Sequence, residues 1–342
     1  MKPNPLPNLL PKVSIVMSLY NHKAFLPRRI ESFQNQTLTD WELIIVDDCS
    51  TDGSYDLVCA LTAGDGRITV LRNEFNRGYA YTCQRGFDAA CGEYLYRADS
   101  DDYCAPAFLE HLCALMDGHP NVGLAHCRGL GLDERDGSWG GWPRQKSCVT
   151  PGLDVFRRAV VKYHIKAPTI LFRRLVAVEA GGFSQGFVVS NDWYLTLRMC
   201  LLADVAFLDE PLAYHRSHGS NMSGDRSHQI DLQKIEKETF GVIDDACAHA
   251  PKPLRAEIEA LRRAAYVNIA QAHYRTAQWA REQGMEEQAQ QLEALIEKYV
   301  PLEEAQTPVT RPGLKQHLHG LAGPLIKRFT YKKLPPLRLK GG

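Results

Sequence analysis

The stretch "VSIVMSLYNHKAFLPRRIESFQNQTLTDWELIIVDDCSTDGSYDLVCALTA", residues 13–63, decides the fold of this chain. Two apolar runs, 13–19 and 41–48, alternate with segments of helical spacing at 25–36 and 50–63. Each apolar run has the length of a buried strand. Strands separated by helices of this length predict an α/β fold with a doubly wound, mostly parallel sheet and helices on both faces.

The alternation continues along the chain. It predicts the further strands 68–73, 93–98 and 122–127, and helices over about 79–90 and 106–117. Residues 133–147 are predicted as a Gly/Trp loop, and residues 181–203 as a loop that enters a helix near Asp192. Heptad-like apolar spacing over 254–300 predicts a C-terminal helical appendage. The expected divisions are an α/β domain over 1–224, the appendage over 225–306 and a tail over 307–342.

Composition excludes several classes of protein. The 342 residues are 44% hydrophobic and 23% charged, as in ordinary globular proteins, and 40 basic residues balance 40 acidic ones. Without a net positive field, a nucleic-acid partner is not expected. Ten cysteines without a CxxC pair are typical of free thiols in a reducing compartment. Since no apolar run approaches the roughly 18 to 20 residues of a membrane span, the chain is expected in the cytoplasm.

The tail over 307–342 has a charge pattern of its own. It contains no acidic residue, and its Lys and Arg residues are interleaved with Leu, Ile, Phe and Tyr. This pattern predicts contact with an anionic membrane surface, on the inner face of the plasma membrane. A solvated basic tail is the alternative.

The segment "RADSDD", residues 97–102, places Asp99, Asp101 and Asp102 together after a predicted strand. Close carboxylates repel one another unless a cation lies between them. Mg²⁺ and Mn²⁺ take oxygen ligands and are often shared with the phosphates of a substrate. A helix-capping turn would explain Asp101 or Asp102, but it would leave Asp99 unexplained.

Polar residues also follow the other predicted strands. Tyr20 and Asn21 follow the first strand, Asp47 and Asp48 end the second, and Asn73 and Asn76 follow the third. Ligands of doubly wound sheets bind outside the carboxyl ends of the strands. The four strand ends are therefore expected to surround one site.

Four segments in order resemble glycosyltransferase family 2, whose members are inverting, nucleotide-sugar-dependent enzymes with the GT-A fold. They are the opening stretch to Ser54, "NRGYAYTCQRGFDAACGEYLYRADSDD" (76–102), "GGFSQGF…NDW" (181–193) and "YHRSHGSNMS" (214–223). The resemblance runs from about Lys12 to Ser223. It implies the GT-A form of the doubly wound sheet and a site that binds a nucleoside-diphosphate sugar.

The resemblance implies a role for each matching residue. Asp101 of the DxD motif would bind the metal, Mn²⁺ or Mg²⁺, and His218 matches a position that approaches the metal or diphosphate in some members. Asp99 would contact the ribose or the donor sugar. The remaining residues expected to bind donor or nucleotide are Leu19, Tyr20, Asn21, Asp47, Asp48, Asn76, Arg77, Gly78 and Ser100.

Asp192 matches the second residue of the family's ED pair and would be the base that deprotonates the acceptor hydroxyl. It could also cap the following helix. Asn191 stands where the family usually has Glu, and Cys83 and Gln84 replace a common Arg-Asn pair. The residues expected on the acceptor side are Trp139, Trp142, Asn191 and Trp193.

The expected activity is inverting sugar transfer from a nucleoside-diphosphate sugar, most simply a UDP-sugar, to a glycan or lipid-linked glycan. The resemblance implies bacterial cell-surface polysaccharide synthesis: lipopolysaccharide, capsule or exopolysaccharide. A nicotinamide dehydrogenase is excluded because "SLYNHKAF" stands where G-x-G-x-x-G is needed. A catalytically silent nucleotide-sugar-binding or scaffold protein of the same fold remains the alternative, because of Asn191.

Overall fold

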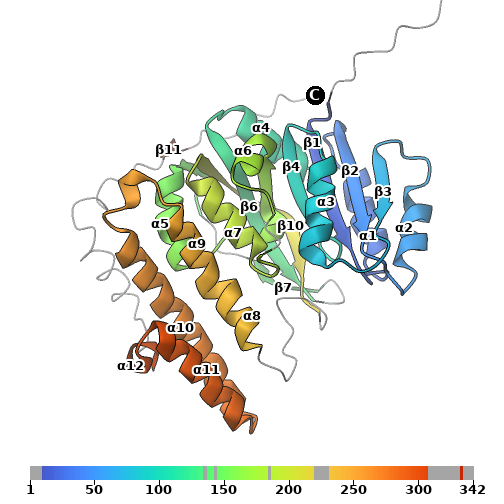
Figure 1. The fold of residues 1–342 in the computed structure, drawn as a ribbon. Helices are drawn as coiled ribbons and strands as arrows, with labels where there is room; N and C mark the ends of the chain where they lie inside the picture. Colours follow the sequence, from blue (N-terminus) through green and yellow to red (C-terminus); the bar gives the residue numbers. More distant parts are fainter. Residues whose placement is uncertain are drawn as a thin grey trace, which may run out of the picture.

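The computed structural model describes residues 10–133, 137–141, 145–183, 186–218, 231–306 and 332–333. At its centre is an 11-stranded mixed sheet with helices on both faces (Figure 1). The helices that follow residue 231 extend away from one side of this sheet (Figure 1).

The first half of the sheet is parallel. Its strands, in spatial order, are β4 (Tyr94–Asp99), β1 (Val13–Leu19), β2 (Trp41–Asp47) and β3 (Ile68–Arg72). The connecting helices are α1 (Leu26–Gln34), α2 (Ser54–Thr62) and α3 (Tyr79–Ala89). The predicted alternation of strands and helices up to residue 99 is thus confirmed.

The second half of the sheet is mixed. β6 (Val122–Leu132) and β10 (Asp204–Arg216) are parallel to each other, and β9 (Ile170–Arg173) lies antiparallel between β4 and β6. The short strands are β5 (Tyr103–Cys104), β7 (Ser138–Gly141), β8 (Cys148–Thr150) and β11 (Lys332–Lys333). The complete order is β11-β8-β10-β6-β9-β4-β1-β2-β3, with β5 paired to β10 and β7 to β6.

The prediction of a loop over 133–147 is wrong in part, because β7 lies within it. Its sequence, "SWGG", has little intrinsic preference for a strand. It becomes a strand because its backbone pairs with β6, with Leu130 opposite Gly141. Such pairing between distant segments cannot be read from local composition.

Both faces of the sheet are covered. In β1, Val13, Ile15 and Met17 belong to the core on one face, and Val16 belongs to the core on the other. The first core packs under α1 and α4 (Phe108–Asp117). The second packs under α3, α5 (Gly152–Val161) and α7 (Asn191–Cys200). Full burial on both faces explains why the central strands are nearly continuous apolar runs.

The helices after residue 231 begin with α8 (Leu232–Glu236), the π-helix η2 (Lys237–Gly241) and α9 (Val242–Ala248). The long helices α10 (Ile258–Glu282) and α11 (Glu286–Tyr299) follow, and then α12 (Leu302–Gln306). Phe240, Ile243 and Ile258 join the same hydrophobic core as α5 and α7. Ala270, Ala277 and Leu292 form two smaller clusters away from it. The beginning of the helical region therefore packs directly on the sheet, and the division of the chain into domains stays a prediction.

Three short helices complete the fold: η1 (Ala167–Thr169), α6 (Arg174–Glu179) and η3 (Lys252–Leu254). Among the described residues, no helix combines the length and the apolar character that crossing a bilayer requires.

Candidate functional site

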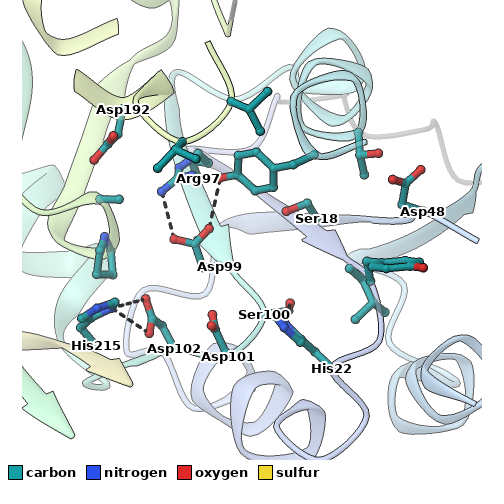
Figure 2. A pocket seen from close by; sticks show the side chains of 18 of the residues that line it. Ser18, His22, Asp48, Arg97, Asp99, Ser100, Asp101, Asp102, Asp192 and His215 are labelled. Carbon is teal, nitrogen blue, oxygen red and sulfur yellow. Dashed lines mark hydrogen bonds and ion pairs between the residues drawn. The ribbon is translucent and has the colours of Figure 1, made fainter. Parts of the chain in front are cut away.

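A cavity of about 740 Å³ lies at the carboxyl ends of β1 and β4. Asp192 and Asp48 lie on opposite sides of it, with Asp99 and Asp101 between them (Figure 2). The predicted site residues that line the cavity are Leu19, Tyr20, Asn21, Asp48, Asn76, Gly78, Asp99, Ser100, Asp101, Asp192 and Trp193. Residues from 19 to 193 are thus brought to one surface by the sheet.

Other predicted residues lie outside this lining. Asp47, Arg77, Asn191 and His218 are not part of it, although His218 contacts Asp101, which is. Trp142 lies outside the described residues, and of Trp139 only the backbone, in β7, is described.

The neighbouring carboxylates Asp47 and Asp48 have different surroundings. Asp47 is fully buried and pairs with the Arg72 guanidinium, with 3.2 Å between Oδ2 and Nε. Asp48 accepts hydrogen bonds at 2.8 Å from the backbone N–H groups of Arg77 and Gly78. Gly78 has a φ of 84°, which favours glycine. Asp48 therefore fixes the turn that leads into α3, and this turn lines the cavity.

Asn21 shapes the turn after β1. It is in the left-handed region with a φ of 54°, which Asn tolerates better than most residues. Its Oδ1 accepts a 2.8 Å hydrogen bond from the Thr51 N–H, and its own N–H donates to Ser50 Oγ at 3.0 Å. These bonds tie the β1 turn to the β2 turn at the edge of the cavity.

Both oxygens of the Asp99 carboxylate have partners. Arg97 Nη2 donates to Oδ2 at 3.0 Å, and the Tyr79 hydroxyl donates to Oδ1 at 3.2 Å (Figure 2). Burial lowers the pKa of Arg97, but the charges of Asp99 and Asp192 outweigh it and the net shift is upward. Arg97 therefore stays cationic and places a positive charge between the two carboxylates.

Asp101 lies in a cluster of possible metal ligands. Its Oδ2 is 3.0 Å from His218 Nε2, and one ligand atom from each of His22, Asp101 and His218 lies within 4.8 Å of the others. Burial raises the pKa of Asp101, while the His218 contact and the His22 charge lower it, with a net decrease. An ionised carboxylate with two imidazoles is a donor set that fits a first-row divalent ion such as Mn²⁺. Mg²⁺ prefers an all-oxygen set.

Asp102 points away from this cluster. It is 2% exposed, and its Oδ1 accepts a 2.8 Å hydrogen bond from the Arg216 N–H of β10. Burial raises its pKa to about 6, and the hydrogen bond to Asp102 raises the pKa of His215. Helix α4 begins after Ala107, so neither Asp101 nor Asp102 caps it. The role of Asp102 is to join the DxD turn to the end of β10, two residues before His218.

Asp192 lies in the first turn of α7, after the N-cap residue Ser190. The alternative that Asp192 itself caps this helix is therefore wrong. Its Oδ1 accepts a 2.8 Å hydrogen bond from the Trp193 N–H. Burial raises the pKa of Asp192, and the Arg97 charge partly offsets that rise. A carboxylate with a raised pKa, on the wall of a cavity, has the properties of a general base.

Trp193 has a fixed orientation beside Asp192. Its indole Nε1–H donates to the Ala159 carbonyl at 2.9 Å, and its ring stacks on Tyr163 with centroids 5.8 Å apart. The ring borders the cavity and offers a rigid apolar surface for a sugar.

Several lining residues were not predicted from the sequence: Ser18, His22, Thr82, Arg97, Tyr163, Lys166 and His215. Arg97 could have been suspected, because a charged residue inside the otherwise apolar run 94–98 needs a buried partner. His22 gave no such signal. Only the turn after β1 brings its ring to Ser100, with 2.7 Å between Nδ1 and Oγ.

Solved structures share this fold. Residues 1–349 of S. aureus TarS, in complex with UDP-GlcNAc, superpose with a TM-score of 0.61 at 18% identity, covering 76% of this chain and 81% of that one. The mannosyltransferase PcManGT of Pyrobaculum calidifontis, in complex with GDP-Man and Mn²⁺, gives 0.53 at 18% identity, covering 94% and 88%. At this identity the likeness concerns the fold alone. That fold, with a DxD segment at the end of β4, defines the GT-A class.

The sequence comparison identifies the family. Residues 14–175 match the model of glycosyl transferase family 2. The GalNAc(5)-diNAcBac-PP-undecaprenol beta-1,3-glucosyltransferase of Campylobacter jejuni is 32% identical over 130 residues, which are 38% of this chain. The matched part is only 41% of that enzyme's length. Residues 14–175 thus belong to glycosyltransferase family 2, and the resemblance noted in the sequence is confirmed for this part of the chain.

Proposed function

We propose that this protein transfers a sugar, with inversion, from a nucleoside-diphosphate sugar to an acceptor hydroxyl in the synthesis of bacterial cell-surface polysaccharide. The observation that carries the proposal is the cavity itself. It has the DxD carboxylates on its floor and a separate carboxylate, Asp192, on the wall formed by α7.

The donor half of the cavity is expected around β1 and β4. Leu19 and Tyr20 border the proposed subsite for the nucleotide base. Asp48 orders the turn from Asn76 to Gly78 beside that subsite. Asp99, held by Arg97 and Tyr79, is oriented to accept hydrogen bonds from sugar or ribose hydroxyls. UDP-GlcNAc and GDP-Man are bound by the two structural neighbours, which supports a nucleotide-sugar donor in this site.

The proposed metal ligands are Asp101, His218 and His22. When bound there, Mn²⁺ would supply positive charge to the diphosphate and make the nucleoside diphosphate a better leaving group. The chain's own contribution is to hold two imidazoles and an ionised carboxylate together, with Asp102 fixing the strand that leads to His218. The Mn²⁺ in the mannosyltransferase supports this ion.

Asp192 is the proposed catalytic base, which removes the proton of the acceptor hydroxyl. Inversion requires the acceptor hydroxyl to attack the anomeric carbon from the face opposite the diphosphate, so the base belongs on the wall facing the donor. The acceptor proton passes to an oxygen of Asp192 while the bond to the anomeric carbon forms and the bond to the diphosphate oxygen breaks. The positive charge of Arg97 favours the ionised form of Asp192, which is the form that accepts the proton.

The acceptor is proposed to be a glycan or a lipid-linked glycan. The Campylobacter relative is named for a lipid-linked acceptor, which supports this class. The protein is proposed to act in the cytoplasm, with its basic C-terminal tail in contact with the anionic inner face of the plasma membrane.

A silent nucleotide-sugar-binding protein is the second candidate, favoured by Asn191 in place of the usual Glu. A hydrolysis screen over UDP-, GDP- and dTDP-sugars, with and without Mn²⁺, separates the two. Metal-dependent release of nucleoside diphosphate from one donor is the expected result. Donor binding without release from any donor would favour the silent protein.

A further inference from the structure

The turn that precedes Asp192 is held by a residue of the C-terminal helical region. Val188, Val189 and Ser190, two to four positions before Asp192, line the cavity. Ser190 is the N-cap residue of α7, yet its hydroxyl makes no capping hydrogen bond to that helix. It donates instead to the backbone carbonyl of Glu238, at 2.6 Å.

The side chain of Glu238 holds the same turn. Oε1 accepts a 2.6 Å hydrogen bond from the Val188 N–H, and Oε2 accepts a 2.9 Å bond from the Ser190 N–H. Glu238 is only 6% exposed, so these bonds are shielded from water. Charge-assisted hydrogen bonds in such surroundings are stronger than neutral ones.

Glu238 lies in η2, a single π-helical turn between α8 and α9. Such turns are uncommon and are often found at functional sites. The residue lies beyond the part of the chain that matches the family model, which ends at residue 175. The cavity wall next to Asp192 thus depends on a segment outside that match.

We propose that Glu238 is a positioning residue, which fixes the Val188–Ser190 turn and thereby sets the distance from Asp192 to the acceptor hydroxyl. This inference rests on the proposed function, because it assigns Glu238 to the acceptor side of that site. Among the described residues, both oxygens of its carboxylate bond to this turn, on the Asp192 side of the cavity. The loss of Glu238 is therefore expected to affect transfer and to spare nucleotide binding.

The test uses the full chain and the Glu238→Gln variant. Glutamine has the same shape, but its amide NH₂ would face one of the two N–H donors, so one hydrogen bond is lost. Ser190→Ala is the second variant and removes only the hydroxyl bond to the Glu238 carbonyl. Glu236→Gln is the matched control, because Glu236 lies two residues away and pairs with Lys298 at 2.5 Å.

Three quantities are measured: the kcat of transfer, the Kd for UDP with Mn²⁺ by calorimetry, and hydrogen exchange of residues 187–193. Glu238→Gln is expected to lower kcat about 10- to 100-fold, since small misplacements of catalytic groups have effects of this size. The Kd should stay within about twofold of wild type. Exchange of residues 187–193 should be faster than in the control, and Ser190→Ala should show the same pattern with smaller amplitude.

Wild-type kcat and wild-type exchange in Glu238→Gln would overturn the proposal. So would a loss of nucleotide binding equal to the loss of kcat, because that would indicate a general structural defect. If the wild-type protein transferred no sugar, the proposed function would fail, and hydrogen exchange alone would then decide the role of Glu238. Faster exchange than in Glu236→Gln would support it, and equal exchange would exclude it.

Discussion

Asp101 and His218 are 117 positions apart in the chain, and 3.0 Å separates the carboxylate Oδ2 from the imidazole Nε2. The contact joins the end of β4 to the residues that follow β10. With His22 it forms a group of three side chains whose ligand atoms lie close enough together to hold a divalent ion.

The metal site gives the first prediction. His22→Gln and His218→Gln should each weaken Mn²⁺ binding. Mutation of a residue that only supports a metal ligand lowers affinity by roughly 10- to 100-fold, so the loss of a ligand should cost at least as much. Electron paramagnetic resonance of bound Mn²⁺ would measure the affinity, and nitrogen couplings would count the imidazole ligands. His119→Gln is the control, because His119 Nδ1 contacts the Leu115 carbonyl away from the cluster. Unchanged nitrogen couplings in His22→Gln would remove His22 from the ligand set.

The second prediction concerns the base. Asp192→Asn keeps the shape of the side chain but cannot accept the acceptor proton, so transfer should fall by about 10²- to 10⁴-fold. Donor binding, measured by calorimetry, should be unchanged. Asp56→Asn is a matched control, because Asp56 also lies in the first turn of a helix, α2. Full transfer activity in Asp192→Asn would refute the assignment.

The pH dependence gives the third prediction. Burial raises the pKa of Asp192, so this carboxylate gains its proton at a higher pH than an ordinary aspartate. The base must be ionised to act, and kcat should therefore fall as the pH is lowered through that raised pKa. Arg97→Gln removes a positive charge that favours the ionised form, so the acidic limb of the profile should move to higher pH. If the acidic limb of the Arg97→Gln profile lay at the same pH as in the wild type, a group other than Asp192 would set it.

The link between Asp102 and β10 gives the fourth prediction. Asp102→Ala leaves the buried Arg216 N–H without its acceptor, which costs about 1–3 kcal/mol. Thermal unfolding should occur at a lower temperature. Mn²⁺ binding should weaken as well, since Arg216 lies two residues before His218. A stability loss with unchanged Mn²⁺ affinity would separate the two roles.

The tail gives the fifth prediction. Replacing Lys315, Lys327 and Lys340 by Glu reverses three charges and should reduce sedimentation with anionic liposomes. The attraction amounts to about 1 kcal/mol for each cation near the surface. Neutral liposomes are the control. Equal binding of both proteins to anionic liposomes would exclude the tail as a membrane contact.

Much of the fold could be predicted from the sequence. The strands β1 to β4 are apolar runs bounded by turn residues and separated by helices, so local pattern and the rules for parallel sheets were enough. The mixed half of the sheet was harder. β7 consists of "SWGG", and it forms a strand only because it pairs with β6.

The site divides in the same way. Asp99, Asp101 and Asp192 were found because they belong to short motifs in which the chemistry requires carboxylates. His22, Arg97 and Glu238 belong to no such motif. The places of His22 and Glu238 depend on contacts with residues 78 and 48 or 50 positions away, respectively. Arg97 has a local partner in Asp99, but its proximity to the charge of Asp192 is set by the tertiary structure.

The sequence by itself thus determined the parallel sheet, the family and the carboxylates at the strand ends, because these follow from periodicity and from residues close together in the chain. Tertiary structure alone decided which of them share a cavity. It placed Asp48 on the lining and Asp47 outside it, and it added two histidines to Asp101. The physical reason is that distances between residues far apart in the chain are set by how strands pair and helices pack, which no local pattern specifies.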